Sequence, residues 1–92
     1  GYRIFRAFMN IPKSADPTKS GEFELDVKGL FASRAKVFVD GVCVFDGETK
    51  SGAPLAVPFR QGKTGKAELR ILLEAAKDGD SGIKGGVVLR MK

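Results

Sequence analysis

The sequence contains no histidine, no tryptophan, one cysteine and one tyrosine. A single cysteine excludes a disulfide within the chain, and the lack of histidine removes the usual zinc ligand sets and the commonest general base of enzymes. No uninterrupted apolar run approaches the roughly 18 residues that a membrane-spanning helix needs. We therefore expect a chain with no catalytic residues, no metal site, no cofactor and no membrane span.

The composition is that of a folded domain, since 42% of the 92 residues are hydrophobic and 29% are charged. Residues 1–92 are too few for two independent cores, so we expect a single domain. The chain begins on glycine and runs directly into strand-like residues, which indicates a piece of a larger protein whose targeting signal lies outside it. The net charge of +5 comes from scattered lysines and arginines without a nucleic-acid-binding motif, so we expect no specific nucleic-acid partner.

Alternating apolar and polar residues predict β-strands along most of the chain. Residues 67–76 could be helix or strand by composition, and we assign a strand because the neighbouring segments are strands separated by regularly spaced turn signals. About seven strands and no helix predict an all-β fold, a small antiparallel two-sheet sandwich of the jelly-roll or Greek-key type. The predicted strands are residues 2–12, 22–28, the two arms of a hairpin over 35–47, 54–60, 67–76 and 87–92, with connections at 13–21, 29–34, 47–53, 61–66 and 77–86.

The hairpin "AKVFVDGVCVFDG" (35–47) is apolar on both faces. Asp40-Gly41 predicts a type I′ turn that places Val39 opposite Val42 and Val37 opposite Val44. These valines should face the core, leaving Phe38, Cys43 and Phe45 on a second apolar face that must be covered by a neighbouring domain or another copy. For the Cys43 thiol itself, the default interpretation is a small buried apolar side chain.

Charged residues near the predicted loops are the candidates for contact with a sugar. Residues 78–82, "DGDSG", resemble the start of a calcium loop but lack its later acidic ligands, so a turn is favoured. "GKTGK" at 62–66 does not have the spacing of a phosphate-binding loop and is also assigned as a turn. The glycan-contact candidates are Asp46, Glu48, Lys50, Arg60, Asp78 and Asp80.

The order of segments "NIPKS…SGEFELDV", "AKVFVDGVCVFDG", "PLAVPFRQGKTGKAELRILLEA" and "GGVVLRMK" resembles the sugar-binding jelly rolls of secreted carbohydrate-active enzymes. The two similar families are the protective-antigen-type domain and the galactose-binding-like domain. The stretch before the hairpin, "KGLFASRAK", has no carboxylate where protective-antigen-type lectins carry a calcium-binding Asp-Asp-Gly loop. The resemblance therefore implies a jelly roll without calcium.

The resemblance also implies a function. We expect a non-catalytic accessory module of a carbohydrate-active enzyme, such as a glycoside hydrolase or sulfatase, exported with its parent protein. Such a module braces the catalytic domain or contacts glycan. The alternative is a self-associating structural module of an envelope, pilus or phage particle, in which the partner is a like subunit.

Overall fold

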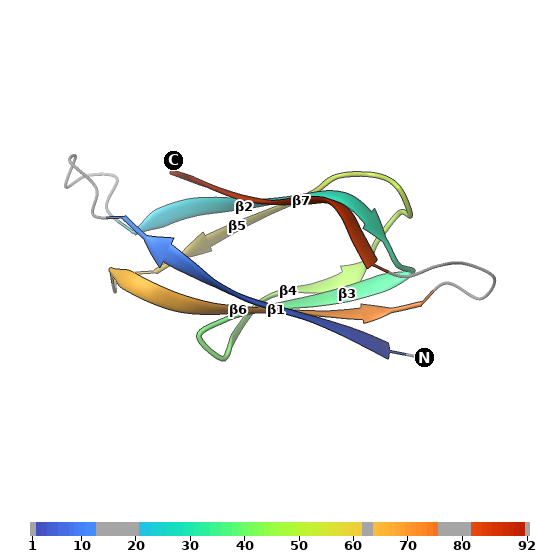
Figure 1. Ribbon diagram of the computed structural model, residues 1–92, viewed down its shortest axis with the longest axis horizontal. Coiled ribbons are helices and arrows are strands. Elements are labelled where there is room, and N and C mark those ends of the chain that lie inside the picture. The colour runs from blue at the N-terminus through green and yellow to red at the C-terminus, as the bar shows by residue number, and fades with distance from the viewer. Residues whose placement is uncertain (1, 13–20, 62–63, 76–81, 92) are drawn as a thin grey trace.

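The computed structural model describes residues 2–12, 21–61, 64–75 and 82–91. Antiparallel strands form two sheets that pack face to face, one with the order β1-β6-β3-β4 and the other with the order β5-β2-β7 (Figure 1). The predicted two-sheet, seven-stranded sandwich is thus confirmed. The strands are β1 (Tyr2–Ile11), β2 (Glu22–Phe31), β3 (Arg34–Val39), β4 (Val42–Glu48), β5 (Leu55–Arg60), β6 (Gly65–Glu74) and β7 (Gly82–Met91).

The strand pairs are nested along the chain. β3 pairs with β4, β2 with β5 and β1 with β6, as if one long hairpin had been rolled up. Successive pairs alternate between the two sheets, and β3 also pairs with β6, which joins the innermost and outermost pairs in one sheet. This nesting is the jelly-roll arrangement, and β7 extends the second sheet by pairing with β2.

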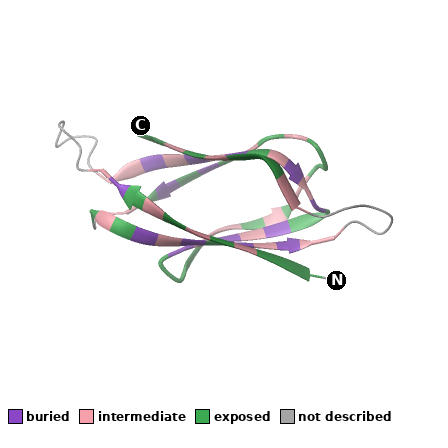
Figure 2. Cartoon of the chain, in the orientation of Figure 1, coloured by how far each residue is buried: buried purple, intermediate pink, exposed green. Residues whose placement is uncertain are grey.

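The core lies between the inner faces of the two sheets (Figure 2). Phe23 and Phe59 stack there with their ring centroids 5.7 Å apart. Burying each large aliphatic side chain contributes about 1.5–3 kcal/mol, so this layer is the main source of stability. Its largest fully buried members are Phe23, Ile11, Leu25, Leu30, Ile71, Leu73, Val27, Val37 and Val57.

The ambiguous segment is a strand from residue 67 to Glu74, where β6 ends, so the choice of strand over helix is confirmed there, and residue 76 lies outside the described residues. Ala67, Leu69, Ile71 and Leu73 are buried, so the segment buries every second residue as a strand does. β6 lies between β1 and β3, and pairing on both sides overrides the helix preference of its alanine, leucine and glutamate residues.

Four predicted connections are partly strand. β4 continues to Glu48 within the predicted connection 47–53, and β6 begins at Gly65 within the predicted connection 61–66. β2 continues through the predicted connection 29–34 as far as Phe31, and β7 begins at Gly82 within the predicted loop 77–86, whose residues 77–81 lie outside the described part. A register shift between Lys28 and Leu30 breaks the period-two pattern that marks a strand. Gly29 lies at this shift and Gly85 lies opposite it. Because glycine is unfavourable in strands, the sequence around both residues does not predict a strand.

The hairpin turn has the predicted geometry, with a φ of 49° at Asp40 and 81° at Gly41, but one predicted pairing is wrong. Val39 pairs with Val42 as expected, whereas Val37 pairs with Phe45 rather than Val44. A β-bulge at this point lets two residues of β4 oppose one residue of β3.

The bulge changes the faces of the hairpin. Val44 and Phe45 both pack against the core, so Phe45 does not share a face with Phe38 as predicted. Phe38 pairs with Cys43, and these two residues remain on the side of the sheet that faces away from the core. The period-two pattern cannot predict a bulge, because it assumes that each residue of one strand pairs with a single residue of the other.

Gly85 and Gly86 provide a test of how tightly β7 approaches β2. A Cβ on Gly85 would lie 2.8 Å from the carbonyl carbon and oxygen of Lys28, whereas Gly86 has open space but a φ of +88°. Gly85→Ala should lower the free energy of unfolding by about 2 kcal/mol or more through overpacking, and Gly86→Ala by about 1 kcal/mol through backbone strain. Urea titration of both variants measures the difference, and equal losses would contradict the close contact at Gly85.

Candidate functional site

The side of the β1-β6-β3-β4 sheet that faces away from the core, here called the outer face, carries an apolar patch. The patch consists of Tyr2, Ile4, Phe38 and Leu72. Register places Ile4 opposite Leu72 and Leu72 opposite Lys36, while Phe38 lies one row further along, opposite Arg70. β1, β6 and β3 thus each contribute to one continuous surface.

The patch is open to solvent and shaped by two shallow hollows. Tyr2 is 71% exposed and Ile4 67% exposed, values far above those of core residues. A hollow of about 320 Å³ is lined by Ile4, Phe38, Gly41, Arg70 and Leu72. A second hollow of about 460 Å³ is lined by Tyr2, Arg34, Ala35, Lys36, Leu72 and Glu74. Because Leu72 borders both, the two hollows form one uneven apolar surface.

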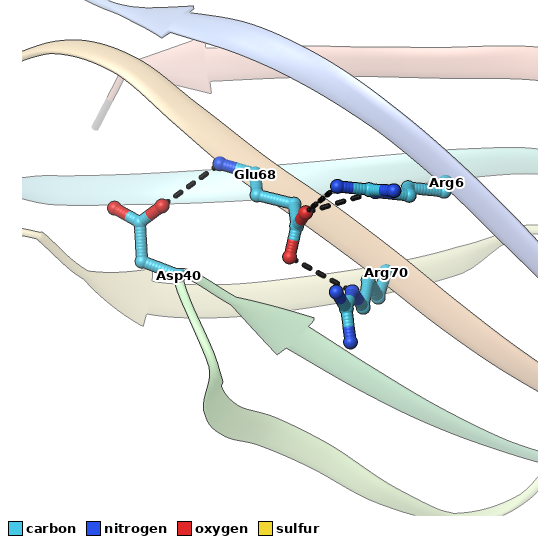
Figure 3. Close-up of polar contacts among 4 residues, drawn as sticks. All are labelled: Arg6, Asp40, Glu68 and Arg70. Carbon is cyan, nitrogen blue, oxygen red and sulfur yellow. Dashed lines mark hydrogen bonds and ion pairs between the residues drawn. The ribbon is translucent and has the colours of Figure 1, made fainter.

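Glu68 anchors a charge cluster beside the patch (Figure 3). Its carboxylate lies 2.6 Å from the Arg6 guanidinium and 2.8 Å from that of Arg70, so one anion bridges two cations. The hydrogen bond from Arg6 is the main cause that lowers the pKa of Glu68 below its ordinary value of 4.5, and the charges of Arg6 and Arg70 act in the same direction. Partial desolvation opposes this shift.

Asp40 ties the hairpin turn to β6. Its backbone N–H donates to the Glu68 carbonyl at 2.9 Å, and its carboxylate accepts from the Glu68 backbone N–H at 2.8 Å. The same carboxylate accepts from the side-chain amide of Gln61 at 2.7 Å. Asp40 thus extends the β3–β6 pairing beyond the end of β3, which holds Phe38 beside β6.

Two further features complete the outer face. Asp46 accepts a hydrogen bond from Arg34 at 3.1 Å and lies 4.0 Å from Lys36. Phe8, which is 55% exposed, has the Lys66 ammonium 4.3 Å and the Arg6 guanidinium carbon 5.5 Å from its ring centroid. The carboxylates of Glu68 and Asp46 beside the patch are therefore engaged by cations of the same sheet.

The predicted glycan contacts do not form one cluster. Asp46 and Glu48 lie on β4 and Lys50 in the loop after it. Arg60 lies on the other sheet, where it forms an ion pair with Glu22 at 2.6 Å, next to Gln61 at the hairpin-turn end of the sandwich. Asp78 and Asp80 lie outside the described residues.

The predicted interface residues have different positions. Phe38 lies in the patch, and Cys43 beside it is exposed rather than a buried apolar side chain. Phe45 packs against the core because of the bulge. Sequence reasoning did not identify Tyr2, Ile4 and Leu72, although the two-sided apolar character of residues 2–12 was a signal for the first two.

Comparison of the chain with family models, curated proteins and solved structures gave no match. Among the described residues, no three acidic or cysteine side chains gather as a metal-binding group. No helix in the same ranges is long and apolar enough to cross a membrane. The geometry of the outer face is therefore what indicates function.

Acid titration tests the bridging role of Glu68. A carboxyl group whose pKa is lowered by folding contributes stability above its ordinary pKa, and this contribution is lost as the pH falls through the lower folded-state value. Between about pH 6 and pH 3, Glu68→Gln should therefore lose less stability than the wild type. Urea unfolding across this range measures the slope, with Glu24→Gln on the other sheet as the charge-matched control. Identical slopes for the wild type and Glu68→Gln would contradict the prediction.

Proposed function

We propose that this chain is a non-catalytic accessory module that braces a neighbouring catalytic domain through its outer face. The observation that carries the proposal is the apolar patch of Tyr2, Ile4, Phe38 and Leu72, two of whose members are exposed and beside which ion pairs form on the same sheet. Protein interfaces have this arrangement, with an apolar centre that excludes water and a polar rim.

The chemistry of the patch favours a protein over a sugar. Glycan recognition needs hydrogen-bonding groups free to meet sugar hydroxyls, because a buried hydroxyl without a partner is costly. Here Glu68 is engaged by Arg6 and Arg70, and Asp46 by Arg34. Ile4 and Leu72 instead offer aliphatic surface, which gains from burial against another apolar surface.

A second candidate, glycan contact, is supported by the hollow beside Tyr2. This aromatic ring lies next to Arg34, Lys36 and Glu74 in a hollow of about 460 Å³. A sugar could stack on the ring and reach these charged groups from one side. This contact would be weak and would accompany the bracing role.

The parent protein that we propose is an exported carbohydrate-active enzyme. The nested strand pairs and the segment order "NIPKS…SGEFELDV" to "GGVVLRMK" are similar to the sugar-binding jelly rolls that accompany such enzymes. In a self-associating module of an envelope, pilus or phage particle, the same patch would instead be buried between copies.

A binding experiment tests the proposal. It uses the chain and the catalytic domain that adjoins it in the parent protein, with the two expressed separately. Isothermal titration should show saturable binding that Ile4→Asp weakens at least tenfold, because burial of an isoleucine contributes about 2 kcal/mol. Ile4 is 67% exposed, so the variant should fold normally. Val88→Asp, at a 44% exposed position on the other sheet, is the matched control and should bind like the wild type.

The thiol of Cys43 provides a second readout on the same face, because Cys43 is exposed and pairs with Phe38. The adjoining domain should protect it from maleimide labelling. No binding, or equal binding by Ile4→Asp, would contradict the bracing role. A concentration-dependent mass of the chain alone would favour self-association, and saturable binding on a glycan array that Tyr2→Ala abolishes would favour glycan recognition.

A further inference from the structure

Arg70 borders the apolar patch near the middle of the outer face. In the register of the sheet, it lies between Arg6 of β1 and Phe38 of β3. Leu72 follows it on the same face of β6, because side chains two residues apart in a strand point the same way. The hollow of about 320 Å³ is lined by Arg70 together with Ile4, Phe38 and Leu72. A partner that fills this hollow therefore also covers Arg70.

The guanidinium of Arg70 is only partly engaged. Its Nε lies 2.8 Å from one carboxylate oxygen of Glu68, and the other oxygen of Glu68 contacts Arg6 at 2.6 Å. Within the described ranges, the two terminal amino groups of Arg70 have no hydrogen-bond or ion-pair partner. The contact through Nε therefore fixes one side of the guanidinium and leaves its outer end with two parallel donors.

The charges beside Arg70 leave room for a further anion. Arg70 and Arg6 share the single carboxylate of Glu68, so two cations meet one anion at this point of the sheet. Asp40 also lies beside Glu68, but its carboxylate accepts from the backbone of β6 and from the side-chain amide of Gln61. A carboxylate brought by a partner would add the second negative charge that the two guanidiniums lack.

Covering the patch has a consequence for Arg70. The Arg70 side chain is 53% exposed, so water can solvate its terminal amino groups in the free chain. A partner that packs on the patch removes this water, and a charged donor buried without an acceptor is costly. The partner must therefore supply an acceptor at the outer end of the guanidinium. A carboxylate suits this position best, because its two oxygens match two parallel donors and its charge is opposite.

We infer that the domain braced through the outer face presents an aspartate or glutamate carboxylate to the terminal amino groups of Arg70. Beside this carboxylate, an apolar side chain of the domain fills the hollow lined by Ile4, Phe38 and Leu72. The inference rests on the proposed function and states the chemistry of the partner surface. Arg70 sets specificity in this arrangement, because a partner without the carboxylate leaves its donors buried and unpaired.

Isothermal titration of the adjoining catalytic domain with Arg70→Lys tests the inference. Lysine keeps the positive charge but lacks the two parallel donors, so the variant should bind at least tenfold more weakly than the wild type. Arg90→Lys is the matched control, since Arg90 is 65% exposed and pairs with a carboxylate, that of Asp26, on the other sheet. It should bind like the wild type. Thermal unfolding followed by circular dichroism checks that both variants fold.

A double-mutant cycle identifies the partner group. Surface acidic residues of the catalytic domain are replaced singly, Asp→Asn or Glu→Gln, and each variant is titrated with the wild-type chain and with Arg70→Lys. One substitution should weaken binding of the wild-type chain at least tenfold and binding of Arg70→Lys less than threefold. Groups in direct contact show such coupling, whereas groups that are far apart have additive effects.

The outcomes separate this inference from the proposed function. Equal binding by Arg70→Lys and the wild type, with Ile4→Asp still weakened, would overturn the inference and leave the bracing role intact. The inference also fails if no acidic residue of the domain is coupled to Arg70. No binding by the wild type would overturn both. Saturable binding of an acidic glycan that Arg70→Lys weakens, without binding of the domain, would also overturn both, since a sugar would then supply the carboxylate.

Discussion

The pairing of β6 along both of its edges is the constraint on which the rest of the structure depends. β6 pairs with β1 on one side and β3 on the other, so it connects the outermost and innermost strand pairs of the jelly roll. Its buried residues, such as Ile71, form the middle of the core, while Glu68, Arg70 and Leu72 alternate with them on the outer face. A shift of β6 by one residue would exchange these sets and remove the core and the patch together.

The outer surfaces of the two sheets differ in polarity, which explains why the candidate site lies on one of them. On the β5-β2-β7 sheet, β2 presents acidic residues that pair with cations from both neighbours, Glu22 with Arg60 and Asp26 with Arg90. Among the described residues of that surface, Val88 is the one large exposed apolar side chain away from the strand ends. On the four-stranded sheet, paired charges instead surround exposed apolar side chains. Solvent does not favour such a surface, and this is the physical argument for the partner that we propose.

The sequence predicted the parts of the fold that depend on local patterns. The alternation of Phe23, Leu25 and Val27 placed β2, and Asp40-Gly41 placed the hairpin turn, because period two and positive φ are local properties. The bulge at Val44 and the close approach at Gly29 and Gly85 could not be predicted in this way, since they depend on the partner strand. The bulge directs Phe45 towards the core. The close approach of the two glycines accompanies the register shift beyond which β2 and β7 continue to pair.

The candidate site was less predictable than the fold for a related reason. Phe38 was identified from the hairpin alone, because its own strand shows that it faces away from the valines. Ile4 and Leu72 join it only through the pairing of β1 with β6, whose paired residues lie far apart in the sequence. The glycan candidates were chosen by charge and proximity along the chain, yet Arg60 is on a different sheet from Asp46.

β1 contributes to three surfaces at once, and its attachment to β6 makes this possible. Its residues Phe5 and Met9 pack against the core, Ile4 faces outward, and its free edge borders a hollow of about 180 Å³ that it shares with Val87 and Leu89 of β7. An edge strand with so little burial of its own would fray if backbone pairing alone held it. The ion pair of Arg6 with Glu68 and the contact of Lys66 with Phe8 add side-chain links between β1 and β6 at the middle and far end of the strand. β1 can therefore expose its outer residues to solvent without separating from the sheet.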